Sequence, residues 1–198
     1  MKHYFRNMSF TSVRAQAIRD PRALRALAHP ARLAILERLT SQGPATATEC
    51  AGTAGLSPSA CSYHLRALAR WGLVTETDTT DRRERRWQAE GPFVIGDHDQ
   101  PRQADVRAAE HLLTGTVIEQ ATQRVLTYLD RSDDEPRPWR DAATVSSRSL
   151  LMTADELTDL LEQVDALVAP YLASHRKNEA PPDARRVHLH SSAVPARP

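Results

Sequence analysis

Residues 55–74 read GLSPSACSYHLRALARWGLV, and this stretch decides how the rest of the sequence is interpreted. Ser57 followed by Pro58 is a helix N-cap with a proline at the first helical position, and Gly72 is suited to end the helix just after Trp71. The apolar residues recur at helical spacing, at Leu56, Ala60, Leu65 and Leu68. The first turns otherwise carry small or polar residues, so one face of this helix is left for hydrogen bonding.

Other helices are predicted upstream of this stretch. Residues 46–49, TATE, have the spacing of a capping box and predict a short helix to about Ala54, with Gly55 supplying a left-handed turn. Two helices joined across a short turn that contains glycine have the spacing of a helix-turn-helix. The pairs Asp20-Pro21 and His29-Pro30 predict the starts of two earlier helices.

The first turns of the helix that begins at Pro58 are predicted to enter the major groove of DNA. Small polar side chains there let base edges and phosphates approach to hydrogen-bonding distance, and a helix N-terminus favours an anion. The candidate DNA-contacting residues are Ser57, Ser59, Ser62, Tyr63 and Arg66. The alternative is that Ser57 is only a cap and the others form a solvated face. The whole set, preceded by a turn helix and followed by a basic hairpin, favours DNA contact.

That hairpin is predicted by two extended runs, LVTETDT and RRWQAE, on either side of a polar turn at residues 80–83. Four arginines lie at its tip: Arg82, Arg83, Arg85 and Arg86. Guanidinium groups beside such a helix suit phosphate or minor-groove contact, although charged solvent turns are common. We assign Arg83 and Arg85 to DNA and expect Trp87 to pack the hairpin onto the helices.

The charge is distributed unevenly along the 198 residues. Residues 1–90 hold 14 Lys and Arg against 8 Asp and Glu, a balance of +6, whereas residues 91–198 hold 12 against 17, a balance of −5. A basic half indicates a polyanionic partner. Because the sequence has no membrane-length apolar run, no secretory signal and only two cysteines, we expect a cytoplasmic protein.

The second half is predicted to begin with a linker at residues 91–101, followed by a long helix at residues 102–130. A loop is expected at 131–139. A C-terminal extension at residues 140–194 is predicted as strand, helix and strand, with strands at 142–152 and 185–192 and a capping box at Thr153-Ala154-Asp155-Glu156. We expect the long helix to dimerise, with its face at Leu112, Leu113 and Val117 covered by a second copy or by the C-terminal helix. The extension is expected to serve the dimer or to hold an effector.

Residues 20–90 resemble the winged helix-turn-helix domain of ArsR-type transcriptional regulators. The matching segments are LRALAHPARLAILERL, the TATE helix, LSPSACSYHLRALARWGLV and TDRRERRW. The whole chain resembles larger helix-turn-helix regulators of actinobacterial type. The resemblance implies a mainly α fold with a small β-hairpin, comprising a winged domain at residues 12–92, the long dimerisation helix and a small α/β C-terminal segment. It also places Ser57, Ser59, Ser62, Tyr63 and Arg66 at the recognition positions.

A metal-sensing repressor is one alternative, because many ArsR relatives use a closely spaced cysteine pair. Here Cys50 and Cys61 are 11 residues apart. Two thiolates without a third ligand make a poor site, and each cysteine is expected to act as a small buried hydrophobe. The histidine candidates lie in three groups: Asp97-His98-Asp99, Glu110-His111 and His188 with His190. We expect no metal and no cofactor.

Two further classes of protein, enzymes and winged helices that bind protein, fit the sequence less well. The sequence has no G-x-S-x-G, glycine-rich phosphate loop or H-E-x-x-H motif, so we expect no enzymatic activity. A winged helix that binds protein would carry an apolar, weakly charged wing, unlike this one. We therefore expect a homodimeric, sequence-specific transcriptional repressor that binds double-stranded DNA and responds to an unidentified small-molecule effector.

Overall fold

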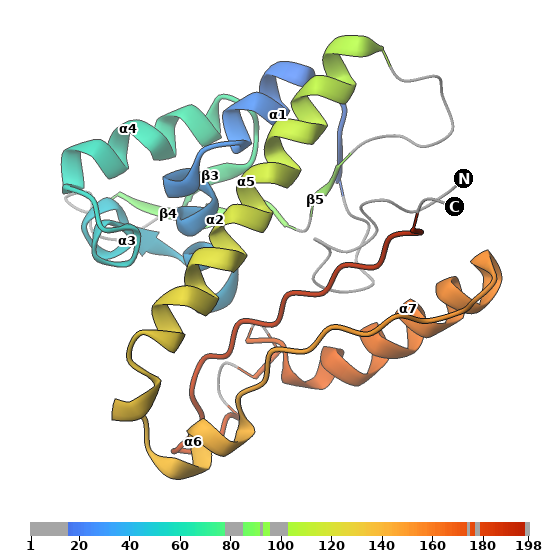
Figure 1. Cartoon of the computed structure of the whole chain (residues 1–198). Helices are drawn as coiled ribbons and strands as arrows, with labels where there is room; N and C mark the ends of the chain where they lie inside the picture. The colour runs from blue at the N-terminus through green and yellow to red at the C-terminus, as the bar shows by residue number, and fades with distance from the viewer. Residues whose placement is uncertain are drawn as a thin grey trace.

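The computed structural model describes residues 16–77, 85–91, 93–95, 103–173, 175–176 and 179–196. Its N-terminal half is a group of short helices closed on one side by a small sheet, and a long helix lies across it (Figure 1). The helices of this part are α1 (Pro21–Leu27), α2 (Pro30–Gln42), α3 (Ala47–Ala54), α4 (Pro58–Ala69) and α5 (Ala104–Leu129). This is the mainly α, winged helix-turn-helix fold that the sequence predicts.

The helices begin where the capping residues place them. Asp20 accepts a hydrogen bond from the Arg22 backbone N–H at 2.8 Å, and His29 Nδ1 accepts one from the Ala31 N–H at 3.2 Å. Each cap is followed by a proline, which has no N–H to leave unpaired at the first helical position. The capping box at Thr46 and Glu49 is formed in both directions. The predicted helix starts are therefore confirmed.

The sheet has the strand order β2-β4-β3, all antiparallel. Its strands are β2 (Ala45–Thr46), β3 (Val74–Thr77) and β4 (Arg86–Ala89). Glu76 and Ala45 both lie opposite Trp87, on the two sides of β4. The predicted hairpin is confirmed in its strands, while its tip at residues 78–84 lies outside the described residues.

A second, parallel pair joins β1 (Gln16–Ile18) to β5 (Phe93–Ile95). The sequence predicted only a linker at residues 91–101, and that prediction is wrong at β5. Three-residue strands are too short to show an alternating pattern, and their partners are far apart in the sequence. The pair brings the two ends of the winged domain together.

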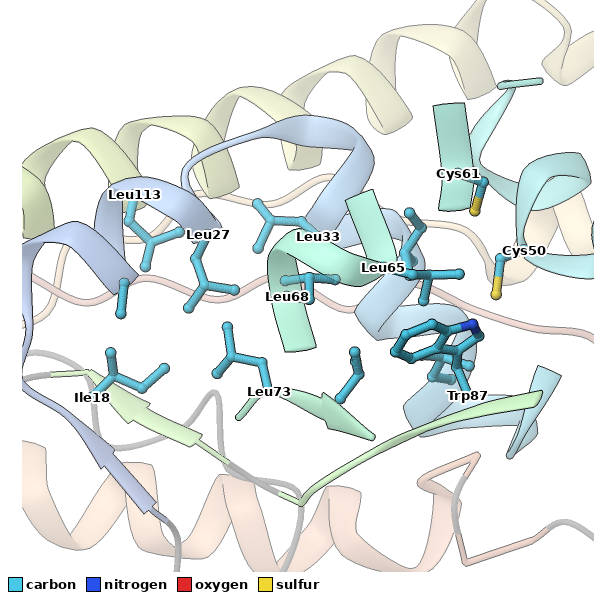
Figure 2. Close-up of a cluster of buried hydrophobic side chains, with 14 of the residues drawn as sticks. Ile18, Leu27, Leu33, Cys50, Cys61, Leu65, Leu68, Leu73, Trp87 and Leu113 are labelled. Atoms are coloured by element: carbon cyan, nitrogen blue, oxygen red, sulfur yellow. The ribbon is translucent and has the colours of Figure 1, made fainter. Parts of the chain in front are cut away.

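One hydrophobic core joins the winged domain to α5 (Figure 2). Its largest fully buried apolar side chains are Leu24, Ile35, Leu65, Leu68, Leu73 and Leu113. On α5, Leu113 is buried and Val117 is partly buried against this core, and α5 contacts α1 and α2. From the sequence, we expected a second copy of the chain or the C-terminal helix to cover these two residues. The chain's own α1 and α2 cover them instead, because α5 turns this stripe toward the domain.

The C-terminal extension differs most from expectation. The capped helix is confirmed as α7 (Ala154–Val168), but residues 143–153 and 184–196 form neither helix nor strand, so the predicted strands are absent there. A short α6 (Arg137–Ala142), preceded by a 3-10 turn at Ser132–Asp134, stands where a loop was expected. Apolar residues alone do not make a strand without a neighbouring edge to pair with.

α7 is followed by a 3-10 turn at Ala169–Tyr171 and lies apart from the winged domain (Figure 1).

The division of the chain at residues 92, 102, 130 and 140 remains a prediction of the sequence. Among the described residues, no helix combines the length and the apolar character that a membrane crossing needs.

Candidate nucleic-acid interface

α4 has one face in the core and one face toward solvent. Cys61, Leu65 and Leu68 are buried at helical spacing. On the opposite side Tyr63 is 64% exposed and Arg66 is exposed. Helical periodicity therefore separates the residues that hold α4 in place from those that can meet a ligand.

The five predicted contact residues of α4 lie together on its outer side. Ser57, Ser59, Tyr63 and Arg66 are exposed, and Ser62 is half-buried. With the other described residues, Ser62 and Arg66 form no side-chain hydrogen bond or ion pair, and Tyr63 makes only a ring contact with His64. These side chains therefore keep their hydrogen-bonding groups available for a partner.

The N-terminus of α4 is shaped by its cap. Ser57 Oγ accepts a hydrogen bond from the Ala60 N–H at 3.3 Å and lies 3.1 Å from Ser59 Oγ. Gly55, at φ +64°, makes the left-handed turn that brings α4 across α3. The capping role of Ser57 is thus present, and it leaves both hydroxyls exposed at the positive end of the helix.

His64 lies at the contact between α4 and α2. Arg32 Nε donates to His64 Nδ1 at 3.4 Å, and Arg32 also donates to the Ala26 carbonyl at 2.7 Å. The ring of His29 stacks at a tilt against His64, with centroids 4.7 Å apart. Burial, then the nearby His29 and Arg32, hold the pKa of His64 below its ordinary value. This contact ties α4 to α2 and to the end of α1.

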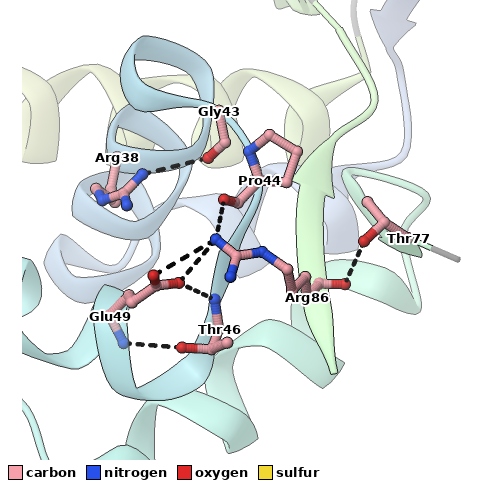
Figure 3. Close-up of polar contacts among 7 residues, drawn as sticks. All are labelled: Arg38, Gly43, Pro44, Thr46, Glu49, Thr77 and Arg86. Atoms are coloured by element: carbon pink, nitrogen blue, oxygen red, sulfur yellow. Dashed lines mark hydrogen bonds and ion pairs between the residues drawn. The ribbon is translucent and has the colours of Figure 1, made fainter. Parts of the chain in front are cut away.

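The two described arginines of the wing differ in their contacts. Arg85 is exposed and forms an ion pair of 3.3 Å with Glu76 on the neighbouring strand. Arg86 instead donates to the Pro44 carbonyl at 3.0 Å and pairs with Glu49 of the α3 capping box at 3.2 Å (Figure 3). Arg85 can leave its pair to reach a phosphate, whereas Arg86 holds β4 to the start of α3.

Glu49 connects the wing to the helix-turn-helix. Its carboxylate accepts from the Thr46 N–H at 2.6 Å, and the same group receives Arg86. Hydrogen bonds from Thr46, followed by the charge of Arg86, hold the pKa of Glu49 below its ordinary value. The sequence showed the capping box but gave no sign that Arg86 would join it.

The predictions at Arg82 and Arg83 fall outside the described residues. Trp87 is 6% exposed, which confirms that it packs into the core. Of the candidate metal-binding groups weighed from the sequence, Asp97-His98-Asp99 lies outside the described residues. Within the described ranges no three His, Cys, Asp or Glu side chains gather as a metal site would require. Cys50 and Cys61 are both fully buried, as expected of small core residues.

The exposed polar helix, the turn helix before it and the hairpin after it together define a winged helix-turn-helix domain, the class of domain that binds DNA. The match to a family model agrees with this class. Residues 27–77, from the end of α1 to the end of β3, match the family model of a helix-turn-helix domain. No curated protein matches the sequence.

Three of the solved structures that match this chain are bacterial proteins. ZitR of Lactococcus lactis is 17% identical over 73% of this chain and 83% of that one, with a TM-score of 0.31. The adhesin competence repressor AdcR of Streptococcus pyogenes is 14% identical over 72% and 81%, with a TM-score of 0.33. YusO of Bacillus subtilis is 16% identical over 75% and 82%, with a TM-score of 0.32. Similarities of this size assign no function, which has to come from the site itself.

Proposed function

We propose that the protein is a sequence-specific transcriptional repressor that binds double-stranded DNA as a homodimer. Its recognition helix is α4, with Ser59, Ser62, Tyr63 and Arg66 facing the major groove. Ser57 contacts phosphate at the helix N-terminus, and Arg83 and Arg85 of the wing contact the backbone or the minor groove.

One observation carries this proposal. The outer face of α4 is exposed and polar, and no other described segment covers it, while its inner face is built into the core. A helix of this kind that served only the fold would not need Tyr63 to expose most of its ring. Residues 1–90 carry a net positive charge, which favours a polyanion as the partner of this face.

The dimer is supported by a second face of α5. Leu112, Leu126 and Leu129 expose 52, 47 and 52% of their surface, and Ile118 and Val125 are exposed beside them. These side chains extend over roughly 25 Å of helix. A second copy of α5 would cover them and would set two recognition helices about 34 Å apart, one turn of DNA.

The experiment that tests the proposal is selection of bound fragments from genomic DNA, followed by footprinting on the best fragment. We expect a protected site with two-fold symmetry. Binding to no fragment at low salt would end the proposal, and an asymmetric single footprint would end the dimer.

Specificity is tested on the selected site with the double variant Ser62→Ala/Tyr63→Ala. Each base contact is worth about 1–3 kcal/mol. The ratio of the affinity for the selected site to the affinity for random DNA should therefore fall by roughly tenfold or more. Fluorescence anisotropy on both duplexes measures this ratio, with Arg148→Ala as a control on an exposed residue of the C-terminal extension. An equal loss on both duplexes would show that the two residues contact only the backbone.

The narrower predictions remain hypotheses. ArsR-type identity and the small-molecule effector rest on the sequence, as do the alternatives of metal sensing and of protein binding through the wing. Arg85, exposed beside Glu76, favours an anionic partner for the wing over an apolar protein surface.

A further inference from the structure

The recognition helix and the helix before it each place a cysteine at their mutual contact. Cys50 on α3 and Cys61 on α4 have no exposed surface, and both belong to the hydrophobic core. Their side chains lie next to each other between the two helices (Figure 2). Both cysteines are free, and each thiol is close enough to the other to shift its pKa.

The surroundings of the pair favour a thiolate at Cys50. The neighbouring Cys61 thiol and then the positive charge of Arg38 lower the pKa of Cys50, against the opposing effects of burial and of Glu49. The neighbouring Cys50 thiol and then burial raise the pKa of Cys61. A thiolate beside a second thiol has both the nucleophile and the resolving group that disulfide formation needs.

We propose that Cys50 and Cys61 form a reversible disulfide when the protein meets a peroxide, and that this bond lowers the affinity of α4 for DNA. The formation of the bond rests on the placement of the two cysteines side by side in the core and does not depend on DNA binding. Its effect on DNA rests on the function proposed above.

The chemistry balances with hydrogen peroxide as the oxidant. The Cys50 thiolate attacks one peroxide oxygen, the O–O bond breaks, and Cys50 becomes a sulfenic acid while the other oxygen leaves and takes a proton to form water. The Cys61 sulfur then attacks Cys50, the S–S bond forms, and the leaving hydroxide takes the Cys61 proton as a second water. The two sulfurs lose two electrons in all, and the peroxide gains them.

A disulfide would disturb the DNA-contacting face because of where Cys61 lies. Two unbonded sulfurs must close to about 2.05 Å to form the disulfide, so α3 and α4 must shift or their side chains must rotate. Ser62 and Tyr63 follow Cys61 directly on α4. A small movement of α4 therefore changes how both residues meet a base, and we expect a loss of about fivefold or more in affinity.

The first experiment counts thiols in the full chain. Protein is treated with hydrogen peroxide, denatured, and labelled with a maleimide reagent that adds visible mass to each free thiol. We expect the count to fall from two to zero in a species that remains a single chain on a non-reducing gel, and dithiothreitol to restore both thiols. A count of two, at a dose that fully oxidises a cysteine-containing peptide, would overturn the proposal. Irreversible sulfinic or sulfonic acids, or a disulfide between chains, would also overturn it.

The second experiment measures the affinity of the reduced, oxidised and re-reduced protein for the selected DNA site. The matched control is Cys50→Ala/Cys61→Ala. It should bind the site with the affinity of the reduced protein, and treatment with peroxide should leave that affinity unchanged. Its thermal unfolding is recorded to show that it folds, and the reversal by dithiothreitol in the wild-type protein needs no variant at all.

The outcomes separate the two proposals. A disulfide that forms without changing DNA affinity overturns the regulatory half of this inference. Reduced protein that binds no duplex overturns the proposed function, and the thiol count is unaffected by that result. A trapped sulfenic acid at Cys50 in the Cys61→Ala variant supports the order of the two steps.

Discussion

At the scale of single residues, neighbours in the sequence have different roles. Arg85 and Arg86 are adjacent and carry the same charge, yet Arg85 faces solvent while Arg86 is bound to Glu49 and the Pro44 carbonyl. The same contrast holds on α4, where His64 packs against His29 while Tyr63 next to it is exposed. Residue type therefore defines what a side chain can bind, and its neighbours decide whether it is available.

Arg85→Ala and Arg86→Ala should have different effects. Arg85→Ala should weaken binding to every duplex and change the slope of log affinity against log salt by about 0.9, because one phosphate contact is lost. Arg86→Ala should instead lower the free energy of unfolding by about 0.5–1 kcal/mol, since its ion pair is partly exposed. Salt titrations of DNA binding and urea unfolding measure the two effects. If the salt slope is unchanged in Arg85→Ala and also in Arg83→Ala, the wing does not contact DNA.

At the scale of elements, the turn between α3 and α4 places the recognition helix. Gly55 ends α3 in a left-handed conformation, and the Leu56 N–H donates to the Ala51 carbonyl at 3.0 Å. Three residues later α4 has begun, so the angle between the helices depends on this one backbone conformation.

Gly55→Ala and Gly52→Ala form a matched pair that tests the turn. Gly55→Ala should cost about 1 kcal/mol of unfolding free energy because alanine disfavours a positive φ. Gly52 lies inside α3 and has nothing within 4 Å of a Cβ, so Gly52→Ala should stabilise by about 0.5–1 kcal/mol. Thermal or urea unfolding compares them. Equal effects of the two variants would show that the turn is not held in the left-handed conformation.

α5 carries the other prediction at this scale. Because Leu126 is 47% exposed in the single chain, Leu126→Glu should leave the monomer folded but separate the proposed dimer. Sedimentation analysis should show a mass of one 22.0 kDa chain in place of two, with weaker binding to the selected site. Gln123→Glu adds the same charge at an exposed polar position of α5 and should leave the dimer intact. A variant that stays dimeric would place the interface elsewhere.

At the scale of the whole molecule, the core and the C-terminal extension are nearly separate. The described core residues extend from Ile18 to Leu113, and none comes from the segment after residue 143. That segment reaches the rest of the chain through polar contacts. Arg185 pairs with Glu135 at 2.8 Å, and His188 Nδ1 lies 3.1 Å from a Glu37 carboxylate oxygen.

A chain ending at residue 142 should therefore keep its fold and its DNA binding. The lost contacts are surface ion pairs, so the unfolding free energy should fall by no more than about 1 kcal/mol. Urea unfolding and anisotropy on the selected site measure both properties, with the full chain as the reference. If the shortened chain becomes a monomer while remaining folded, the extension forms part of the dimer interface.

The local structure of the winged domain could be predicted because its signals are local. Asp20, His29, Thr46 and Ser57 each cap a helix through a bond to a residue two or three positions away, which a sequence shows directly. The exposed face of α4 was also predictable, because buried and exposed positions alternate with the helical period. A resemblance to known regulators supported the same assignment.

The tertiary structure alone decided features that depend on distant partners. The pairing of β1 with β5, the burial of Leu113 against α1, and the Arg86–Glu49 ion pair each join residues far apart in the sequence. The contact between Cys50 and Cys61 is of the same kind, since it depends on the angle at which α3 and α4 cross. Within the winged domain and at α5 and α7, the sequence determined which segments become helices and which faces are apolar, because those preferences lie in neighbouring residues. Which side chains then meet was decided by packing, because a side chain's partners depend on where the whole chain places them.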